Sequence, residues 1–207
     1  MQTISNDIQQ KTPPTLQSET ETPSHLGEGR GGAYHFITTW RVSATCEEVY
    51  RILEDVDALT QWWPSVYLDA KVREKGQPGG VGKLVSLYTK GWLPYTLRWD
   101  FRVTAADFPN GFALRATGDF VGEGVWRFQQ DGDTCVVTYD WRISAEKPIL
   151  KKLTWLLRSI FSANHEWAMR KGLESLELEL RRRRGEQNVP PAPPPTFPHN
   201  LLSNKVF

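Results

Sequence analysis

Side chains that could do chemistry occur together in the stretch NHEWAMRKG, residues 164–172. His165 followed directly by Glu166, on an expected helix, matches the first half of the zinc-binding motif H-E-x-x-H. That motif needs a second histidine one turn later, and Met169 stands there instead. The other histidines lie in or near the ends of the chain: His25, His35 and His199. Because four tetrahedral ligands cannot be assembled from these residues, the sequence predicts no metal site.

The same histidine has two further interpretations. We expect His165 on the helix face that meets a sheet, with Asn164 beside it and Glu166 pointing away. A histidine on the wall of a cavity could move a proton near neutral pH. Alternatively, its ring nitrogens bond to a strand carbonyl or a loop and fix the helix against the sheet. The packing role is favoured, since a lone histidine on an apolar face usually serves packing.

Composition limits the class of protein. The chain has 207 residues, a formal net charge of +1 and 39% hydrophobic residues, which suits one globular domain. The near-neutral charge argues against a dedicated nucleic-acid-binding protein. Cys46 and Cys135 have no metal-ligand spacing, so a disulfide framework is not expected and a reducing compartment fits. No apolar run approaches the ~18 residues of a membrane span, and no signal peptide is recognisable. We therefore expect a cytoplasmic protein without stable membrane insertion.

Aromatic residues are unusually frequent, because nine Trp, nine Phe and six Tyr make up 12% of the chain. So many large rings either fill a core or line a cavity. Trp62 and Trp63 in QWWP could stack on a flat ligand or complete the core, and both roles stay open. Trp92, Leu93 and Pro94 form an apolar cluster in the loop KGWLPYT, where turns are normally polar. Two roles are possible for this cluster: a gate that covers a cavity, or a surface that contacts a membrane or a partner. The gate is the favoured role.

The two ends of the chain differ from its middle. Residues 1–32 are polar, without helical or strand periodicity, and are expected to be disordered. Residues 185–207 form a second tail, in which VPPAPPPTFP is a polyproline II segment that could act as a spacer or bind a partner weakly. A loose tail is the favoured interpretation. The folded domain is therefore expected at residues 33–184.

The elements of that domain follow a readable order. A strand at residues 34–43 precedes a helix that a capping box of Thr45 and Glu48 begins. A second short helix ends at Pro64. Six further segments have strand alternation: 65–72, 82–89, 96–103, 111–120, 124–130 and 134–144. One apolar and one polar face are typical of an antiparallel sheet. Residues 149–184 keep helical periodicity, and this long helix could cover the apolar face.

Two details of these elements bear on a site. The phase of the strand at 82–89 is ambiguous, because a slip of one residue exchanges the faces of a strand. Ser86 and Tyr88 are therefore uncertain cavity residues. The four arginines at residues 181–184 are expected to complement the helix dipole rather than to bind an anionic membrane or a nucleic acid.

The order of elements, with QWWP closing the second short helix and NHEWAMRKGLESLE on the long one, resembles the START-like (SRPBCC) superfamily. Within it, residues 34–180 look like the bacterial polyketide cyclase/dehydrase proteins. The resemblance implies an α+β helix-grip fold, in which a curled antiparallel sheet of about seven strands wraps around a long C-terminal helix. It also implies a deep apolar cavity between sheet and helix. Members of the superfamily bind hydrophobic molecules, and a minority are enzymes, so the fold does not decide the function.

The resemblance leads to three interpretations of function. The favoured one is binding of a hydrophobic, ring-containing small molecule such as a lipid, quinone or polyketide. Its expected contacts are aromatic or small residues: Trp62, Trp63, Trp92, Trp99, Phe101, Trp126, Trp141, Phe161 and Ala168. The second is a cyclase or dehydratase with three candidate catalytic residues: His165 and Tyr139 for proton transfer and Asn164 to polarise a carbonyl. The third is an interaction module that recruits a partner through its Pro-rich tail. No cofactor is expected, because no phosphate-binding glycine loop is present.

Overall fold

The structure is a computed structural model that describes residues 33–145 and 158–196. Its centre is one seven-stranded sheet in the order β1-β7-β6-β5-β4-β3-β2, with every neighbouring pair antiparallel. The strands are β1 Ala33–Val42, β2 Tyr67–Glu74, β3 Leu84–Lys90, β4 Thr96–Asp107, β5 Gly111–Gly118, β6 Phe120–Asp131 and β7 Thr134–Ala145. The first two strands of the chain thus form the two edges of the sheet. The expected seven-stranded α+β helix-grip architecture is confirmed.

Three helices complete the described part of the chain: α1 Cys46–Leu53, α2 Leu59–Trp62 and α4 Arg158–Arg183. The predicted capping box is confirmed, because Glu48 N donates to Thr45 Oγ1 at 3.2 Å and Thr45 N donates to a carboxylate oxygen of Glu48 at 2.8 Å. Residues 149–157, where the long helix was predicted to begin, lie outside the described residues. None of the described helices is long and apolar enough to cross a membrane.

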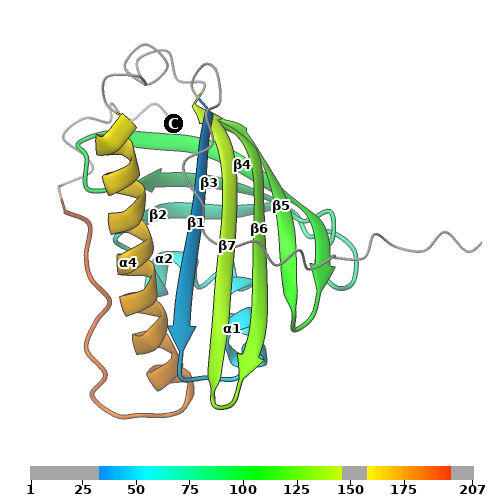
Figure 1. The fold of residues 1–207 in the computed structure, drawn as a ribbon, viewed down its shortest axis with the longest axis vertical. Coiled ribbons are helices and arrows are strands. Elements are labelled where there is room, and N and C mark those ends of the chain that lie inside the picture. The colour runs from blue at the N-terminus through cyan, green and yellow to red at the C-terminus, as the bar shows by residue number, and fades with distance from the viewer. Residues whose placement is uncertain (1–32, 146–157, 197–207) are drawn as a thin grey trace, which may run out of the picture.

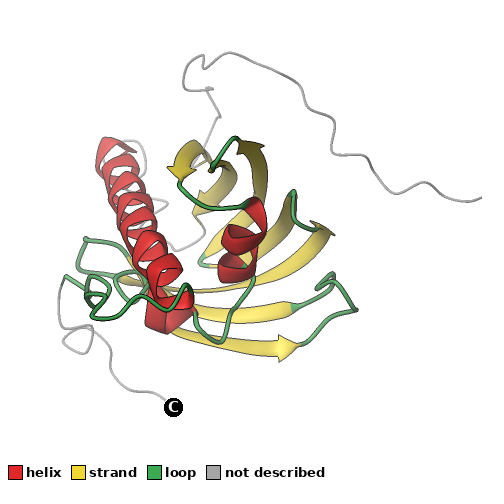
Figure 2. Cartoon of the chain, turned by 90° about the horizontal axis from the view of Figure 1, so that it is seen from below, coloured by secondary structure: helices red, strands yellow, loops and turns green. Residues whose placement is uncertain are grey.

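The sheet curls so that its concave face surrounds the space that α4 closes, with β1 next to this helix (Figures 1 and 2). Side-chain alternation decides which residues face that space. On β4, Leu97 is buried while Arg98 and Arg102 are exposed. This explains why the predicted strands carry one apolar and one charged face.

The uncertain phase of β3 is resolved by contacts on both faces. Val85, Leu87 and Thr89 are buried on the concave side. On the convex side, Arg73 donates to Ser86 Oγ at 3.0 Å. The guanidinium carbon of Arg98 lies 4.3 Å from the centre of the Tyr88 ring on the same side. Ser86 and Tyr88 therefore cannot reach the cavity. The polar side chain that β3 presents on the concave side is Thr89.

A glycine lets α4 approach the rest of the domain closely. A Cβ atom on Gly172 would lie 2.3 Å from Trp63 Cζ2, closer than any side chain tolerates. Leu176, one turn further along the helix, is completely buried. The indole of Trp63 thus fills the place of a side chain at this point, which fixes the helix against the turn that follows α2.

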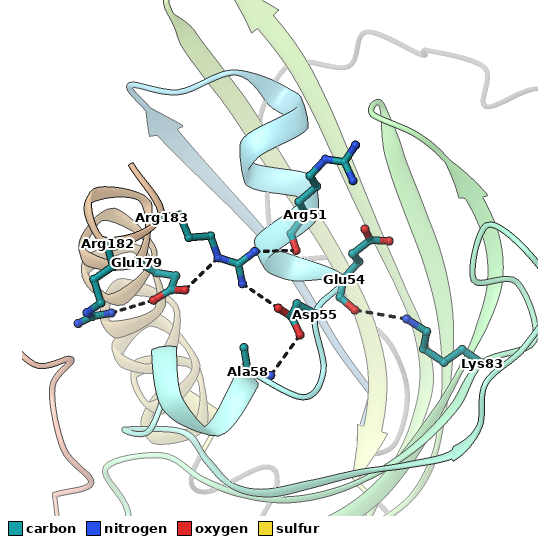
Figure 3. Close-up of polar contacts among 8 residues, drawn as sticks. All are labelled: Arg51, Glu54, Asp55, Ala58, Lys83, Glu179, Arg182 and Arg183. Carbon is teal, nitrogen blue, oxygen red and sulfur yellow. Dashed lines mark hydrogen bonds and ion pairs between the residues drawn. The ribbon is translucent and has the colours of Figure 1, made fainter. Parts of the chain in front are cut away.

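The C-terminal arginines of α4 do more than complement its dipole. Arg183 donates to Asp55 Oδ2 at 2.8 Å and to Glu179 Oε1 at 2.9 Å, and it also contacts the carbonyl oxygen of Arg51 (Figure 3). The next arginine, Arg184, donates to Glu48 at 2.8 Å. These contacts tie the end of α4 to α1 and to the connection between α1 and α2.

The Pro-rich segment turns back after α4. Gly185 and Asn188 have φ angles of +81° and +60°, which reverse the chain, and Arg182 donates to the carbonyl oxygen of Pro190 at 2.8 Å. The described segment then runs back beside α4 (Figure 1). Four residues of this segment are half-buried: Val189, Ala192, Pro193 and Pro195. The last residues of the tail, 197–207, lie outside the described residues.

Two cysteines that are far apart in sequence meet in the core. Cys46, the first residue of α1, and Cys135 on β7 are free and buried, and their Sγ atoms are 3.0 Å apart. Burial raises the pKa of the Cys135 thiol, and so does the neighbouring sulfur of Cys46.

Candidate ligand-binding site

A cavity lies between the concave face of the sheet and α4. The space between its walls, with the open solvent at its mouth included, is about 880 Å³. Ten of its nineteen lining residues are Phe, Tyr or Trp. The wall therefore offers flat apolar surface interrupted by a few hydroxyl, amide and imidazole groups.

Eight of the residues expected in a site line this cavity: Trp63, Trp99, Tyr139, Trp141, Phe161, Asn164, His165 and Ala168. Trp63 follows α2, and the sheet supplies Trp99, Tyr139 and Trp141. The other four residues lie on α4. Sequence reasoning missed eleven further residues of the wall: Tyr34, Phe36, Val66, Tyr67, Thr89, Lys90, Gly91, Tyr95, Leu97, Phe120 and Ile143. Strand phase was a usable signal for Tyr34 and Phe36, because they alternate in step with the buried Trp40.

Four expected contact residues do not line the cavity. Trp62 is completely buried in the core beside Trp63, with ring centres 5.3 Å apart. Trp126 lies behind Tyr139, whose ring stacks on it at 3.9 Å. Both indoles therefore serve the core that surrounds the cavity rather than its wall.

The other two are displaced along the sheet and the loop. Phe101 faces the concave side but lies past Trp99, where it lines a smaller cleft next to α1. Trp92 is half-buried in the loop between β3 and β4 and is not among the lining residues, although its neighbours Gly91 and Tyr95 are. The apolar cluster of this loop thus borders the cavity without Trp92 on its wall.

The imidazole of His165 is held in an apolar setting. Its ring stacks on Phe36 with ring centres 4.2 Å apart, and its Nε2 lies 3.5 Å from Thr38 Oγ1. Burial lowers the pKa of His165 from 6.5 to about 4, so the ring is neutral at pH 7. The packing position and the cavity position considered for His165 are therefore compatible, because the ring packs against β1 and also faces the cavity.

Asn164 holds the loop between β3 and β4. Its Oδ1 accepts a hydrogen bond from Leu93 N at 3.2 Å. A Cβ on Gly91 would lie 2.1 Å from the same oxygen, so a side chain there would displace the amide of Asn164. The amide of Asn164 is therefore already engaged in positioning the loop that borders the mouth of the cavity.

Two phenols reach the cavity from different strands, Tyr67 on β2 and Tyr139 on β7. Burial raises the pKa of both hydroxyls, so both keep their protons at neutral pH. The proximity of Tyr67 raises the pKa of Tyr139 further. Both groups are consequently neutral hydrogen-bond donors.

Charge is scarce on the wall. Among the described residues that line the cavity, none is a carboxylate, and Lys90 is the one with an ionisable amine. Burial lowers the pKa of Lys90, with the nearby Tyr88 acting in the opposite direction. Within residues 33–145 and 158–196, no three His, Cys, Asp or Glu side chains come together as a metal site. The described wall thus offers hydroxyl, amide and imidazole groups and a single amine.

Comparison with known proteins places this geometry in context. A family model described as polyketide cyclase / dehydrase and lipid transport matches residues 34–181. The protein TTHA0849 from Thermus thermophilus is 22% identical, with 72% of this chain and 96% of that chain covered and a TM-score of 0.57. The Zhui aromatase/cyclase from Streptomyces sp. R1128 is also 22% identical, with 73% and 96% covered and a TM-score of 0.57.

A third similar structure is the di-domain ARO/CYC BexL from the BE-7585A biosynthetic pathway. It is 14% identical, with 70% of this chain and 49% of that chain covered and a TM-score of 0.53. At these identities the likenesses establish the fold. A search of the curated proteins found no match.

Proposed function

The chain belongs to the polyketide cyclase/dehydrase and lipid transport family, and on that premise we propose that it binds a hydrophobic, ring-containing small molecule between the sheet and α4. The aromatic lining of the cavity carries this proposal, because ten of its nineteen lining residues are Phe, Tyr or Trp. Removing apolar ligand surface from water drives such binding by about 25 cal/mol per Å². The few polar groups on the wall then set the orientation of the ligand.

A direct test is to purify the protein from its own host, record native mass spectra, and extract and identify anything bound. A co-purifying quinone, lipid or polyketide supports the proposal and names the class of ligand. Absence of a bound molecule, together with no thermal shift across a panel of apolar ring compounds, would contradict it.

A pair of variants on α4 sharpens the test. Ala168 lines the cavity, so Ala168→Phe is expected to fill the space and abolish ligand binding. Ala163 is exposed on the same helix, so Ala163→Phe adds the same ring where it cannot block the site. Equal binding by the two variants would show that the ligand sits elsewhere.

A cyclase or dehydratase is the second candidate, and one observation favours it. The imidazole of His165 lies on the cavity wall, where a ring nitrogen can take up a proton from a bound carbonyl compound, as a weaker base than an exposed histidine because burial lowers its pKa to about 4. The structural likeness to an aromatase/cyclase is in keeping with this chemistry. Replacing His165 with Gln should leave ligand binding nearly intact and abolish turnover, and a variant that keeps full turnover would exclude this role.

Recruitment of a partner by the Pro-rich tail is the third candidate. Pro190, Pro191 and Pro194 are exposed on the described segment. Deleting residues 185–207 should affect only this function. Unchanged ligand binding by the truncated protein, with loss of a partner that the full chain binds, would support it.

A further inference from the structure

The two free cysteines of the core lie on different elements and touch each other. Cys46 is the first residue of α1, and Cys135 is the second residue of β7. Their Sγ atoms are 3.0 Å apart, although 89 positions of sequence separate the two residues. A disulfide has an S–S distance of about 2.05 Å, so the sulfurs need to approach each other by only about 1 Å. The pair is therefore close enough to be oxidised within the folded domain.

Gln130 on β6 fixes the start of α1 beside the strand that carries the second sulfur. Its Oε1 accepts from Cys46 N at 2.8 Å. Its Nε2 donates to the carbonyl oxygens of Ala44 at 3.2 Å and Gly132 at 2.9 Å. In the sheet, Gln130 is also the register partner of Cys135. One side chain thus ties both cysteines to the same hairpin of β6 and β7, which keeps the two sulfurs in contact.

The two thiols differ in their access to solvent. Cys46 keeps 7% of its surface exposed, whereas Cys135 is completely buried. Burial raises the pKa of Cys135, and so does the neighbouring sulfur of Cys46, so this thiol stays protonated at neutral pH. Because oxidants react with accessible thiols, a small oxidant should reach Cys46 before Cys135.

We propose that Cys46 and Cys135 form a peroxide-sensitive switch, in which Cys46 reacts first and Cys135 then closes a disulfide between α1 and β7. In the first step the Cys46 sulfur attacks one peroxide oxygen and the O–O bond breaks. The thiol proton and the released hydroxide form water, which leaves a sulfenic acid on Cys46. In the second step the Cys135 sulfur bonds to the Cys46 sulfur, and the sulfenic hydroxyl leaves with the Cys135 proton as water. The two thiols lose two electrons, and one peroxide molecule is reduced to two water molecules.

Contact between the sulfurs favours the disulfide over further oxidation of Cys46. The second step is intramolecular, because the Cys135 sulfur already lies next to the reacting atom. The new bond joins the start of α1 to β7, a strand inside the sheet between β1 and β6. By the chain-entropy relation, such a cross-link raises the folding equilibrium constant by up to about 1,000-fold. The switch is independent of whatever the cavity binds.

The test exposes the reduced full-length protein to hydrogen peroxide and follows the intact mass and the number of free thiols. The folded wild type should lose two hydrogens and both thiols, and dithiothreitol should restore them. A gain of oxygen atoms without a disulfide would refute the switch. So would two unreacted thiols in the folded protein under conditions that oxidise the protein unfolded in urea.

Two single variants assign the order of the steps. Cys135→Ser lacks the second thiol, so peroxide should leave a sulfenic acid on Cys46 that dimedone traps. Cys46→Ser should keep its buried thiol unmodified over the same time. Dimedone on Cys135 in Cys46→Ser, with none on Cys46 in Cys135→Ser, would overturn the proposed order. Because serine in the core can impair folding, dimedone is also added during oxidation of the wild type, where it should label Cys46 alone.

Hydrogen exchange reports whether the bond acts on α1. The amides of this helix should exchange more slowly in the oxidised than in the reduced wild type, by up to about 1,000-fold where exchange needs global unfolding. Reduction of the oxidised sample provides the matched control, because it changes nothing but this bond. Equal exchange of the α1 amides in the two states, after complete oxidation, would show that the disulfide switches nothing and would refute the proposal.

Discussion

Acidification from pH 7 to pH 5 is expected to destabilise the protein through His165. Burial of the ring lowers its pKa from 6.5 to about 4 in the folded state, whereas the unfolded chain keeps the ordinary value. Between these two values the unfolded chain binds a proton that the folded chain does not. The free energy of unfolding is therefore complete above pH 6.5 and falls as the pH drops toward 4.

The size of the effect follows from the two pKa values. Between pH 7 and pH 5 the linkage relation gives a loss of about 2 kcal/mol, and by pH 4 the loss approaches about 3 kcal/mol. Groups that face the ring do not reverse this sign, because no carboxylate is among the described residues of the wall and the Tyr139 phenol stays neutral. In this pH range, carboxylates with pKa values near or below 4.5 contribute little.

The assay is urea unfolding of the wild type and His165→Gln at pH 7, 6 and 5. The wild type should lose stability over this range, and the variant should lose much less, whatever its stability at pH 7. His35→Gln is the matched control, because His35 is half-exposed and pairs with Asp140 at 3.0 Å on the surface. A titration of the His165 ring protons by NMR reports the same quantity directly. Equal slopes for the wild type and His165→Gln, or a titration midpoint near 6.5, would refute the reasoning.

Three further predictions concern packing, cysteine chemistry and the end of α4. Gly172→Ala should lower the free energy of urea unfolding by about 1–3 kcal/mol, because the new Cβ would lie 2.3 Å from Trp63. Oxidised glutathione should convert Cys46 and Cys135 to a disulfide that spans 89 positions of sequence. The product is seen as the loss of two hydrogens in the intact mass. The chain-entropy relation gives up to about 4.5 kcal/mol of added stability for such a disulfide. Arg183→Gln should reduce stability by only about 0.5–1 kcal/mol, and less at high salt, because its ion pair is about one-third exposed.

Each of these has a control that isolates its cause. Ala163→Gly tests the helix propensity of α4 without a steric change at Trp63. Cys46→Ser should block the oxidation product, and an unchanged intact mass of the wild type would refute the predicted oxidation. Arg170→Gln removes an exposed cation of α4 and should leave stability unchanged. A larger loss there than at Arg183 would show that the contacts in Figure 3 contribute little.

Much of the fold could be predicted because its signals are local. The capping box of Thr45 and Glu48 depends on four consecutive residues, and the strands alternate so regularly that their faces follow from the period of two. The closing helix follows from the length of its apolar pattern. None of these signals needs a partner far away in the sequence.

The strand at β3 shows where local signals end. In LVSLYTK, each of the two faces of the strand carries apolar side chains, whichever face is turned to the core. The sequence alone therefore permits a slip of one residue. The choice is made by residues on neighbouring strands, such as Trp99 on β4, which donates to Thr89. Such cross-strand contacts could not be inferred before the pairing was known.

Strand phase predicts the side of a sheet, but it does not predict depth along it. Phe101 and Trp126 both face the concave side, as expected, and yet neither lines the cavity. The cavity ends where Trp40 meets Trp63 and Trp126, with ring centres 6.0 and 5.6 Å apart. Beyond these rings α1 packs on the sheet, and the same face becomes solid core. Only the three-dimensional position of α1 defines that limit.

Burial has opposite chemical consequences for the two kinds of group on the cavity wall. It lowers the pKa of His165 to about 4, so one ring nitrogen carries no proton at neutral pH and is a weaker base than that of an exposed histidine. It keeps the proton on Tyr139, which leaves a donor and a poor base. Any proton transfer in this cavity should therefore run toward His165, while the phenols stabilise the oxygen on which negative charge develops. Loss of turnover in Tyr139→Phe with a shift of the pH profile would instead assign the proton transfer to the phenol, so the pH profiles of His165→Gln and Tyr139→Phe together decide which group moves the proton.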